Sequence, residues 1–131
     1  MTESKFTIKK ENFTNALNDL KNVFVPENMT TYDYYDGKKH PHFMWVSTQS
    51  VLESKSLGDA LEEIRYKPIF DNAGNICDVK FTGQKYGDEE IFFKALAPHV
   101  ESGSYLRFKG EDGDTWTYDF DLLSGRIPQE N

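Results

Sequence analysis

An alternating segment near the C-terminus, residues 104–121, constrains the fold more than any other part of the chain. Within it, residues 105–109 and 115–120 each alternate between large apolar and polar side chains. A period of two is the pattern of a strand with one buried face. The apolar members of the second run are Trp116, Tyr118 and Phe120. Two such runs separated by a short turn that contains glycine predict an antiparallel hairpin.

The length of this turn decides which residues face one another. A two-residue loop of Asp112 and Gly113 would place charged side chains opposite the rings. A three-residue loop, 111–113, with Gly113 left-handed, instead pairs apolar residues across the strands. Those pairs are Leu106 with Tyr118 and Phe108 with Trp116. We therefore predict the three-residue loop. The outer face then carries Tyr105, Arg107 and Lys109 beside Asp119, Thr117 and Thr115.

Size and composition favour one domain, residues 1–131, with an aromatic core. A chain of 131 residues can bury roughly two-thirds of its unfolded surface around a single core. Ten Phe and seven Tyr supply large apolar groups, although only 37% of the residues are hydrophobic. Cys77 is the single cysteine, so no internal disulfide can form, and we expect a buried thiol in a reducing compartment.

Charge and hydropathy limit the classes of partner. The N-terminus has no apolar run typical of a signal peptide, and no segment is long enough to span a bilayer, so a cytoplasmic location without a membrane partner is expected. The net charge of −7 divides into −2 for residues 1–65 and −5 for residues 66–131. Phosphate binding needs clustered cations, so direct nucleic-acid binding is disfavoured. The acidic half fits a basic protein partner, or serves solubility alone.

The order of elements predicts the fold class. The predicted elements are a strand at 6–9, a helix at 13–24, a strand at 43–47, a helix at 56–64, strands at 66–71 and 76–83, a helix within 87–98, and strands at 105–109 and 115–121. This order, β-α-β-α-β-β-α-β-β, favours an α+β single domain in which one mainly antiparallel sheet carries helices on one face. Its last five elements form a ββαββ unit over about 66–122.

Local signals support several of these elements. Ser56 followed by Asp59 resembles a capping box, and Pro26 and Pro98 limit the helices before them. The segment Asn72-Ala-Gly-Asn75 predicts a four-residue hairpin loop. Such a loop places Tyr66, Pro68 and Phe70 on one face with Phe81, Val79 and Cys77.

Residues 26–42 are the longest segment without a regular pattern, and we expect a binding loop there. The segment contains an Asp36-Gly37 turn signal and three tyrosines. The tyrosines are Tyr32, Tyr34 and Tyr35.

No motif predicts catalysis, a metal or a cofactor. His40 and His42 alternate on an extended segment, but two histidines do not complete a metal site. Asp88, Glu89 and Glu90 are interpreted as the acidic start of a helix. The segment 111–114 is interpreted as a hairpin turn and lacks calcium-ligand spacing. We therefore predict no catalytic residues, no metal, no cofactor and no enzymatic activity.

Four phrases carry a resemblance that covers most of the chain: residues 6–13, 43–46, 57–66 and 103–113. With them the chain resembles small, largely uncharacterised proteins encoded by bacteriophages, plasmids and integrative elements of gut bacteria. The resemblance implies a mobile-element origin and brings no catalytic residues. The ββαββ order also loosely resembles ferredoxin-like domains of phage-related proteins.

The first functional hypothesis is a non-enzymatic inhibitor of anti-CRISPR type. It would bind a host defence nuclease, either a CRISPR effector or a restriction enzyme, at its basic channel, with carboxylates in place of phosphates. The expected partner-binding face is Glu111, Asp112, Asp114, Asp119 and Asp121, with Asp88, Glu89 and Glu90 as a second patch. The interspersed Arg107 and Lys109 count against a pure DNA mimic.

The alternative hypothesis is an immunity protein or adaptor that binds a protein partner through the Tyr32–Trp45 region, because Tyr and Trp anchor protein interfaces. Tyr32, Tyr34 and Tyr35 are its candidate contacts. An uncharacterised enzyme is the third class. The sequence leaves the partner's identity and the oligomeric state open.

Overall fold

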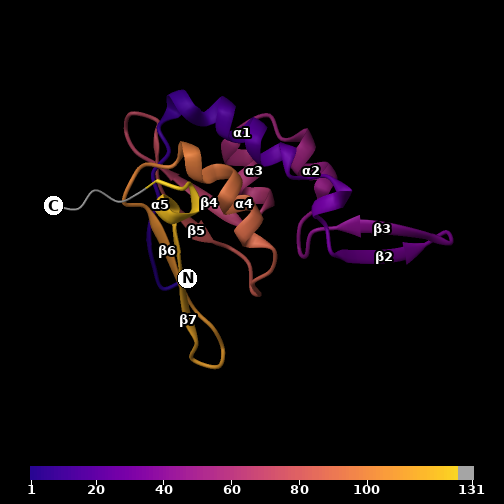
Figure 1. Ribbon diagram of the computed structural model, residues 1–131. Helices are drawn as coiled ribbons and strands as arrows, with labels where there is room; N and C mark the ends of the chain where they lie inside the picture. Colours follow the sequence, from indigo (N-terminus) through magenta and orange to yellow (C-terminus); the bar gives the residue numbers. More distant parts are fainter. Residues whose placement is uncertain (127–131) are drawn as a thin grey trace.

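The computed structural model describes residues 1–126 and confirms the α+β class (Figure 1). Residues 127–131, the end of the predicted domain, lie outside the described part. The strands are β1 (Glu3–Lys5), β2 (Thr31–Tyr35), β3 (Lys38–His42), β4 (Tyr66–Phe70), β5 (Ile76–Phe81), β6 (Tyr105–Lys109) and β7 (Thr115–Asp119). The α-helices are α1 (Phe13–Asn22), α2 (Thr48–Glu53), α3 (Leu57–Glu63), α4 (Glu89–Leu96) and α5 (Phe120–Leu123). Short 3-10 turns are η1 (Lys10–Asn12), η2 (Pro26–Asn28) and η3 (Ala97–His99).

The strands are antiparallel, as predicted, but they form three small sheets rather than one. The sheets have the orders β1-β6-β7, β2-β3 and β4-β5. Ile8, which follows β1, forms isolated antiparallel bridges to Ile76 of β5 and to Val100, which lies in no strand. Such isolated bridges do not extend β1 into a strand that pairs with β5, so the sheets stay separate within residues 1–126. The strand predicted at 6–9 is accordingly this bridge, and the regular strand β1 lies three residues earlier.

The β6-β7 hairpin has the predicted register. Leu106 lies opposite Tyr118, and Phe108 lies opposite Trp116. The Gly110 N–H donates to the Asp114 carbonyl at 2.7 Å, which leaves a three-residue loop. Within that loop Gly113 is left-handed, with φ of 84°. Apolar pairing therefore predicted both the loop length and the turn glycine.

The β4-β5 hairpin confirms two predicted pairs and corrects the third. Tyr66 pairs with Phe81 and Pro68 with Val79, but the register shifts so that Phe70 pairs with Ile76. Asp71 accepts hydrogen bonds from two loop N–H groups, and this turn geometry accompanies the shift. Cys77 consequently faces solvent, so the prediction of a buried thiol was wrong.

The predicted helices form with the expected buried faces. Helix α1 buries Ala16, Leu17 and Leu20 and ends before Pro26. Helix α3 begins after Ser56, whose hydroxyl accepts the Asp59 N–H at 3.1 Å, as the capping signal predicted.

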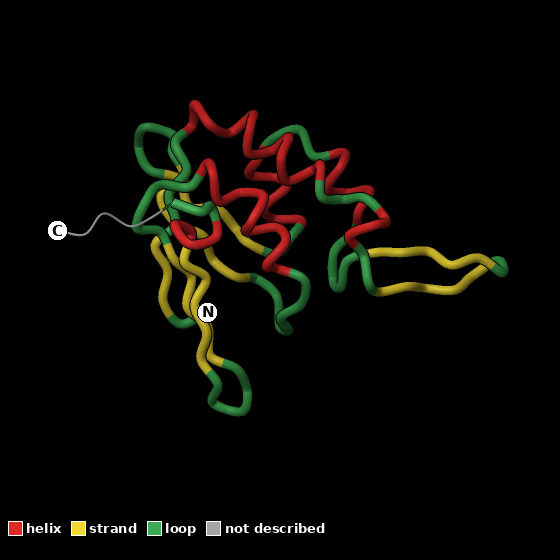
Figure 2. The backbone as a smooth tube through the Cα atoms, in the orientation of Figure 1, coloured by secondary structure: helices red, strands yellow, loops and turns green. Residues whose placement is uncertain are grey.

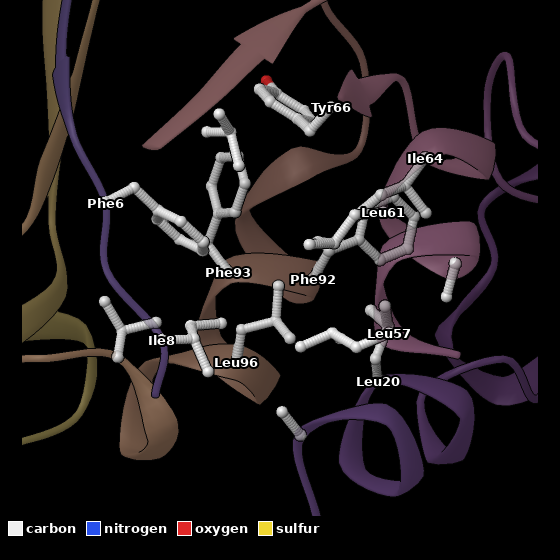
Figure 3. Packing of buried hydrophobic residues seen from close by; sticks show 14 of the residues in the cluster. Phe6, Ile8, Leu20, Leu57, Leu61, Ile64, Tyr66, Phe92, Phe93 and Leu96 are labelled. Atoms are coloured by element: carbon white, nitrogen blue, oxygen red, sulfur yellow. The ribbon is translucent and has the colours of Figure 1, made fainter. Parts of the chain in front are cut away.

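The helices α1, α3 and α4 lie together on one side of the strands, as Figure 2 shows. Between these layers is the predicted aromatic core (Figure 3). The largest fully buried residues include Tyr66, Phe6, Phe43, Phe92, Phe93, Phe108 and Phe120. No helix within residues 1–126 combines the length and the apolar character needed to cross a membrane.

Ile8→Ala tests the contribution of the buried Ile8 side chain to the core. The side chain is fully buried, so we expect a loss of about 2–5 kcal/mol from the free energy of unfolding. The control is Ile69→Ala, which trims the same side chain at a position that is 46% exposed and should cost much less. Urea unfolding of the three proteins measures both effects. Equal losses would contradict the assignment of the Ile8 side chain to the core.

Candidate functional site

Residues 31–42, predicted to be an irregular loop, form the β2-β3 hairpin. Asp36 and Gly37 both have positive φ, 53° and 68°, which is the geometry of a two-residue type I′ turn. Tyr35 and Lys38 pair directly on either side of it. The Asp36-Gly37 signal was visible in the sequence, but the flanking residues are too polar to predict strands.

The hairpin projects away from the rest of the molecule (Figure 1). Among residues 1–126 no third strand pairs with it. Its tyrosines are therefore exposed: Tyr34 by 75%, Tyr35 by 55% and Tyr32 by 38%. Exposed rings in such a number on one small element are unusual for a surface that meets only water.

Contacts within the hairpin hold two of these rings. The Tyr35 and His40 rings stack with centroids 3.5 Å apart. The Lys39 Nζ lies 3.6 Å from the centroid of the Tyr32 ring. Tyr34 has neither kind of contact within the described chain and is the most exposed large side chain of the hairpin.

The two edges of the hairpin differ in their backbone groups. A two-residue loop closes on a hydrogen-bonded pair, and bonded pairs then alternate with unbonded ones. The backbone groups of Tyr32 and Tyr34 therefore point outward from β2, and those of Lys39 and Pro41 point outward from β3. Proline has no N–H, so the edge of β3 is blocked at Pro41, whereas the edge of β2 carries no proline or lysine.

The segment after the hairpin is a tight loop, not the buried strand predicted at 43–47. Phe43 and Val46 are buried, but Met44 and Trp45 are exposed, by 40% and 53%. The loop is held by the Met44 N–H, which donates to the Asp88 carboxylate at 2.8 Å. Trp45 is left-handed, with φ of 67°. An apolar run alone does not distinguish such a loop from a strand.

The residues predicted as a second acidic patch have three separate roles. Asp88 binds the Met44 loop and does not cap α4 with its side chain. Glu89 is 3% exposed, receives the Gly87 N–H at 2.9 Å and forms an ion pair with Arg65 at 3.0 Å. Glu90 lies at the surface, 3.7 Å from Lys94. Of these three carboxylates, Glu90 alone is exposed.

The Arg65–Glu89 pair lies among aromatic rings. The Arg65 guanidinium carbon lies 5.3 Å from the centroid of the Phe81 ring. The buried hydroxyl of Tyr66 has no hydrogen-bond partner within residues 1–126. Burial, assisted by the Glu89 charge, raises the pKa of Tyr66 far above its ordinary value. This group stays neutral and serves packing.

The residues of the predicted acidic face also have different roles. Glu111, Asp112 and Asp114 are exposed at the tip of the β6-β7 hairpin, which extends away from the helices (Figure 2). Asp119 instead caps α5. Its carboxylate accepts hydrogen bonds from the Asp121 N–H at 2.9 Å and from the Leu122 N–H at 3.3 Å.

Asp121 is 6% exposed and is used inside the protein. Its carboxylate accepts hydrogen bonds from the Gly103 N–H at 2.9 Å, the Ser102 hydroxyl at 3.0 Å and Arg126 Nε at 3.0 Å. These partners, the Gly103 N–H foremost, hold the pKa of Asp121 below its ordinary value. The partner-binding role predicted from sequence thus remains a prediction for the three loop carboxylates, whereas Asp121 lacks an accessible surface.

The histidines considered for a metal do not converge. His40 stacks on Tyr35, and His42 Nε2 lies 3.3 Å from Asp33. His99 pairs with Asp19 on α1. Within residues 1–126 no group of three or more potential ligands is placed to hold a metal ion.

No protein-family model, curated protein or solved structure matches this chain. Functional inference rests on the geometry of its own residues. The surface most suited to binding consists of Tyr32, Tyr34 and Tyr35 on the hairpin with Met44 and Trp45 at its base, and is called the aromatic surface below.

Asp121→Asn tests the internal role of this carboxylate. The change removes charge-assisted hydrogen bonds, and we expect a loss of about 2 kcal/mol in the free energy of unfolding at about pH 7. Because the folded pKa lies below the ordinary value of 3.8, the contribution is complete above that value and is lost as pH falls through the folded pKa. The difference from wild type should therefore shrink at about pH 2.

Asp112→Asn is the matched control, because it removes the same charge at an exposed position. Urea unfolding at the two pH values compares the proteins. A loss of stability in the control that equals the loss in Asp121→Asn would contradict the assignment.

Proposed function

We propose that this chain is a non-enzymatic protein-binding module, of the immunity-protein or adaptor type, that binds an extended segment of its partner along the edge of β2. The observation that supports this proposal is the projecting β2-β3 hairpin, which combines exposed tyrosines with one open and one blocked edge.

The exposed rings support a protein partner. Tyrosine and tryptophan bury a large area with few rotatable bonds, and they dominate the binding energy of many interfaces. Tyr34 is 75% exposed and Trp45 is 53% exposed. Burial of two such rings would contribute several kcal/mol to association, at about 25 cal/mol per Å² of apolar surface.

The open edge supports an extended segment as the form of the partner. The outward N–H and carbonyl groups of Tyr32 and Tyr34 repeat at the spacing that an added strand would match. Natural edge strands are commonly protected by lysine, proline or brevity. β3 has such protection in Lys39 and Pro41, and β2 does not.

Tyr34→Pro and Tyr34→Ala together test this mode. Both remove the ring, but only proline removes the outward N–H, in the same way that Pro41 does on β3. We expect Tyr34→Ala to weaken binding about tenfold and Tyr34→Pro by about a further tenfold. The readout is the affinity for peptides selected on the wild-type protein from a displayed library, measured by calorimetry at low and high salt.

Lys39→Pro is the control, because it blocks the opposite edge at the paired position, and it is compared with Lys39→Ala, since both changes remove the contact of Lys39 with the Tyr32 ring. The two Lys39 variants should bind the peptides equally. Equal affinities of the Tyr34→Ala and Tyr34→Pro variants would rule out strand addition, and wild-type affinity in both would rule out the aromatic surface.

A second candidate function is inhibition of a basic nucleic-acid-binding nuclease, as the resemblance to mobile-element proteins implies. The observation that favours it is the group of Glu111, Asp112 and Asp114 at the tip of a hairpin, without a salt bridge within residues 1–126. Exposed carboxylates on a projecting loop are suited to entering a basic channel. The internal use of Asp121 and Glu89 reduces the acidic surface available for this role.

Charge reversal of Glu111, Asp112 and Asp114 to lysine tests this candidate. We expect binding to a CRISPR effector or restriction enzyme to weaken at least tenfold, and wild-type binding to fall with salt, because opposed charges carry the interaction. The control reverses Glu53, Glu62 and Glu63, three exposed acids of α2 and α3, with the same change in net charge. Unchanged nuclease binding in the loop variant would exclude the loop.

A further inference from the structure

Two residues with left-handed backbone line one cavity. Within residues 1–126 the non-glycine residues with positive φ are Asp36, Trp45 and Arg65. The turn explains Asp36, and Arg65 directly follows the C-cap of α3, where a left-handed residue commonly ends a helix. Trp45 and Arg65, at φ of 67° and 75°, both line a cavity of about 490 Å³. Trp45 lies at no helix end, and strain at such a bulky residue tends to be retained where a side chain must be held for function.

The walls of this cavity combine an aromatic face with cations. The lining residues are Trp45, Arg65, Thr82, Gly83, Gln84 and Lys85. The Lys85 Nζ lies 6.0 Å from the centroid of the Trp45 ring. Trp45 is 53% exposed, so its indole retains area for a stacked ring.

The two cations are in different states. Arg65 is held by Glu89 at 3.0 Å and by the Lys85 carbonyl, and its side chain is 15% exposed. Lys85 forms no salt bridge within residues 1–126 and is exposed. The Arg65 charge is neutralised by Glu89, so Lys85 is the available positive charge. The buried Arg65 Nε also has no hydrogen-bond partner in this part of the chain.

Two glycines allow this arrangement. A Cβ at Gly83 would lie 2.8 Å from Arg65 Nη1 and 2.6 Å from Phe81 Cζ. A Cβ at Gly87 would lie 3.0 Å from Trp45 Cδ1. A side chain at either position would therefore displace Arg65 or Trp45.

We propose that this cavity binds a small organic anion with a planar ring, which stacks on Trp45 while its anionic group meets Lys85. Ring stacking on indole and a charge-assisted hydrogen bond to an unpaired ammonium are the interactions that the walls offer. Nucleoside monophosphates and aromatic carboxylates share this chemistry. The cavity shares Trp45 with the aromatic surface but has no lining residue from the β2-β3 hairpin, and strand addition at the edge of β2 does not require Trp45.

Titration of nitrogen-15-labelled protein with a matched panel tests the site. The panel is AMP and benzoate, each with a ring and an anion, adenosine with the ring alone, and inorganic phosphate with the charge alone. We expect AMP or benzoate to shift the Trp45 indole signal and the amide signals of Gly83 and Lys85. If AMP binds, its affinity should exceed the affinities of adenosine and of phosphate about tenfold. If benzoate binds, its affinity should exceed that of phosphate by about the same factor.

Variants assign the two interactions. Lys85→Gln should weaken the anionic ligands about tenfold and leave adenosine unchanged, whereas Trp45→Gly should weaken every ring-containing ligand. Lys109→Gln, at a neighbouring cavity, is the control and should behave as wild type. Trp45→Gly removes left-handed strain but also the buried part of the indole, so its urea midpoint is measured to separate loss of binding from loss of folding.

The proposal is overturned if no member of the panel shifts the Trp45 or Lys85 signals at about 10 mM, or if neither ring-containing anion binds better than its ring-only or charge-only counterpart. It is also overturned if Lys85→Gln and Lys109→Gln have equal effects. Peptide binding at β2 is tested with Tyr34 and Lys39 variants that keep Trp45, and the cavity with Lys85 variants that keep the hairpin, so either proposal can fail while the other holds.

Discussion

The packing of rings around Phe93 is the interaction on which the rest of the structure depends. Phe93 lies on α4, and its ring contacts Tyr66 of β4 at 5.2 Å and Tyr118 of β7 at 4.9 Å between centroids. Within residues 1–126 no strand of the β1-β6-β7 sheet pairs with β4 or β5, so side-chain packing rather than a hydrogen-bonded ladder holds these two sheets together. Large edge-to-face rings suit this purpose because each buries much apolar area and tolerates angled layers.

The core leaves the β2-β3 hairpin and the tip of the β6-β7 hairpin outside it. The β6-β7 hairpin packs its base against the core and exposes an acidic tip, while the β2-β3 hairpin forms a separate sheet (Figure 1). Neither projecting part is needed to bury apolar surface. Their exposed groups, carboxylates on one and tyrosines on the other, are therefore free to contact partners.

Helix α4 connects the core to the cavity beside Trp45. One helical turn separates Glu89 from Phe93, so the packing that positions Phe93 also buries Glu89. Glu89 in turn fixes Arg65, and Asp88 holds the loop that precedes Trp45. Residues interpreted from sequence as a simple acidic helix start thus organise both walls of the cavity. A buried carboxylate requires such a cationic partner, because an unpaired charge in the interior is costly.

Features that depend on near neighbours along the chain could be predicted from the sequence. Alternation predicted the β6-β7 register and left-handed Gly113, and spacing predicted α1, α3 and the Ser56 cap, because turn geometry and one-sided burial are local constraints. The division of the strands into three sheets, the burial of Asp121 and Glu89, and the meeting of Trp45 with Arg65 and Lys85 could not be predicted in this way. Those outcomes depend on contacts between residues distant in sequence, for which charge and hydropathy patterns carry no signal.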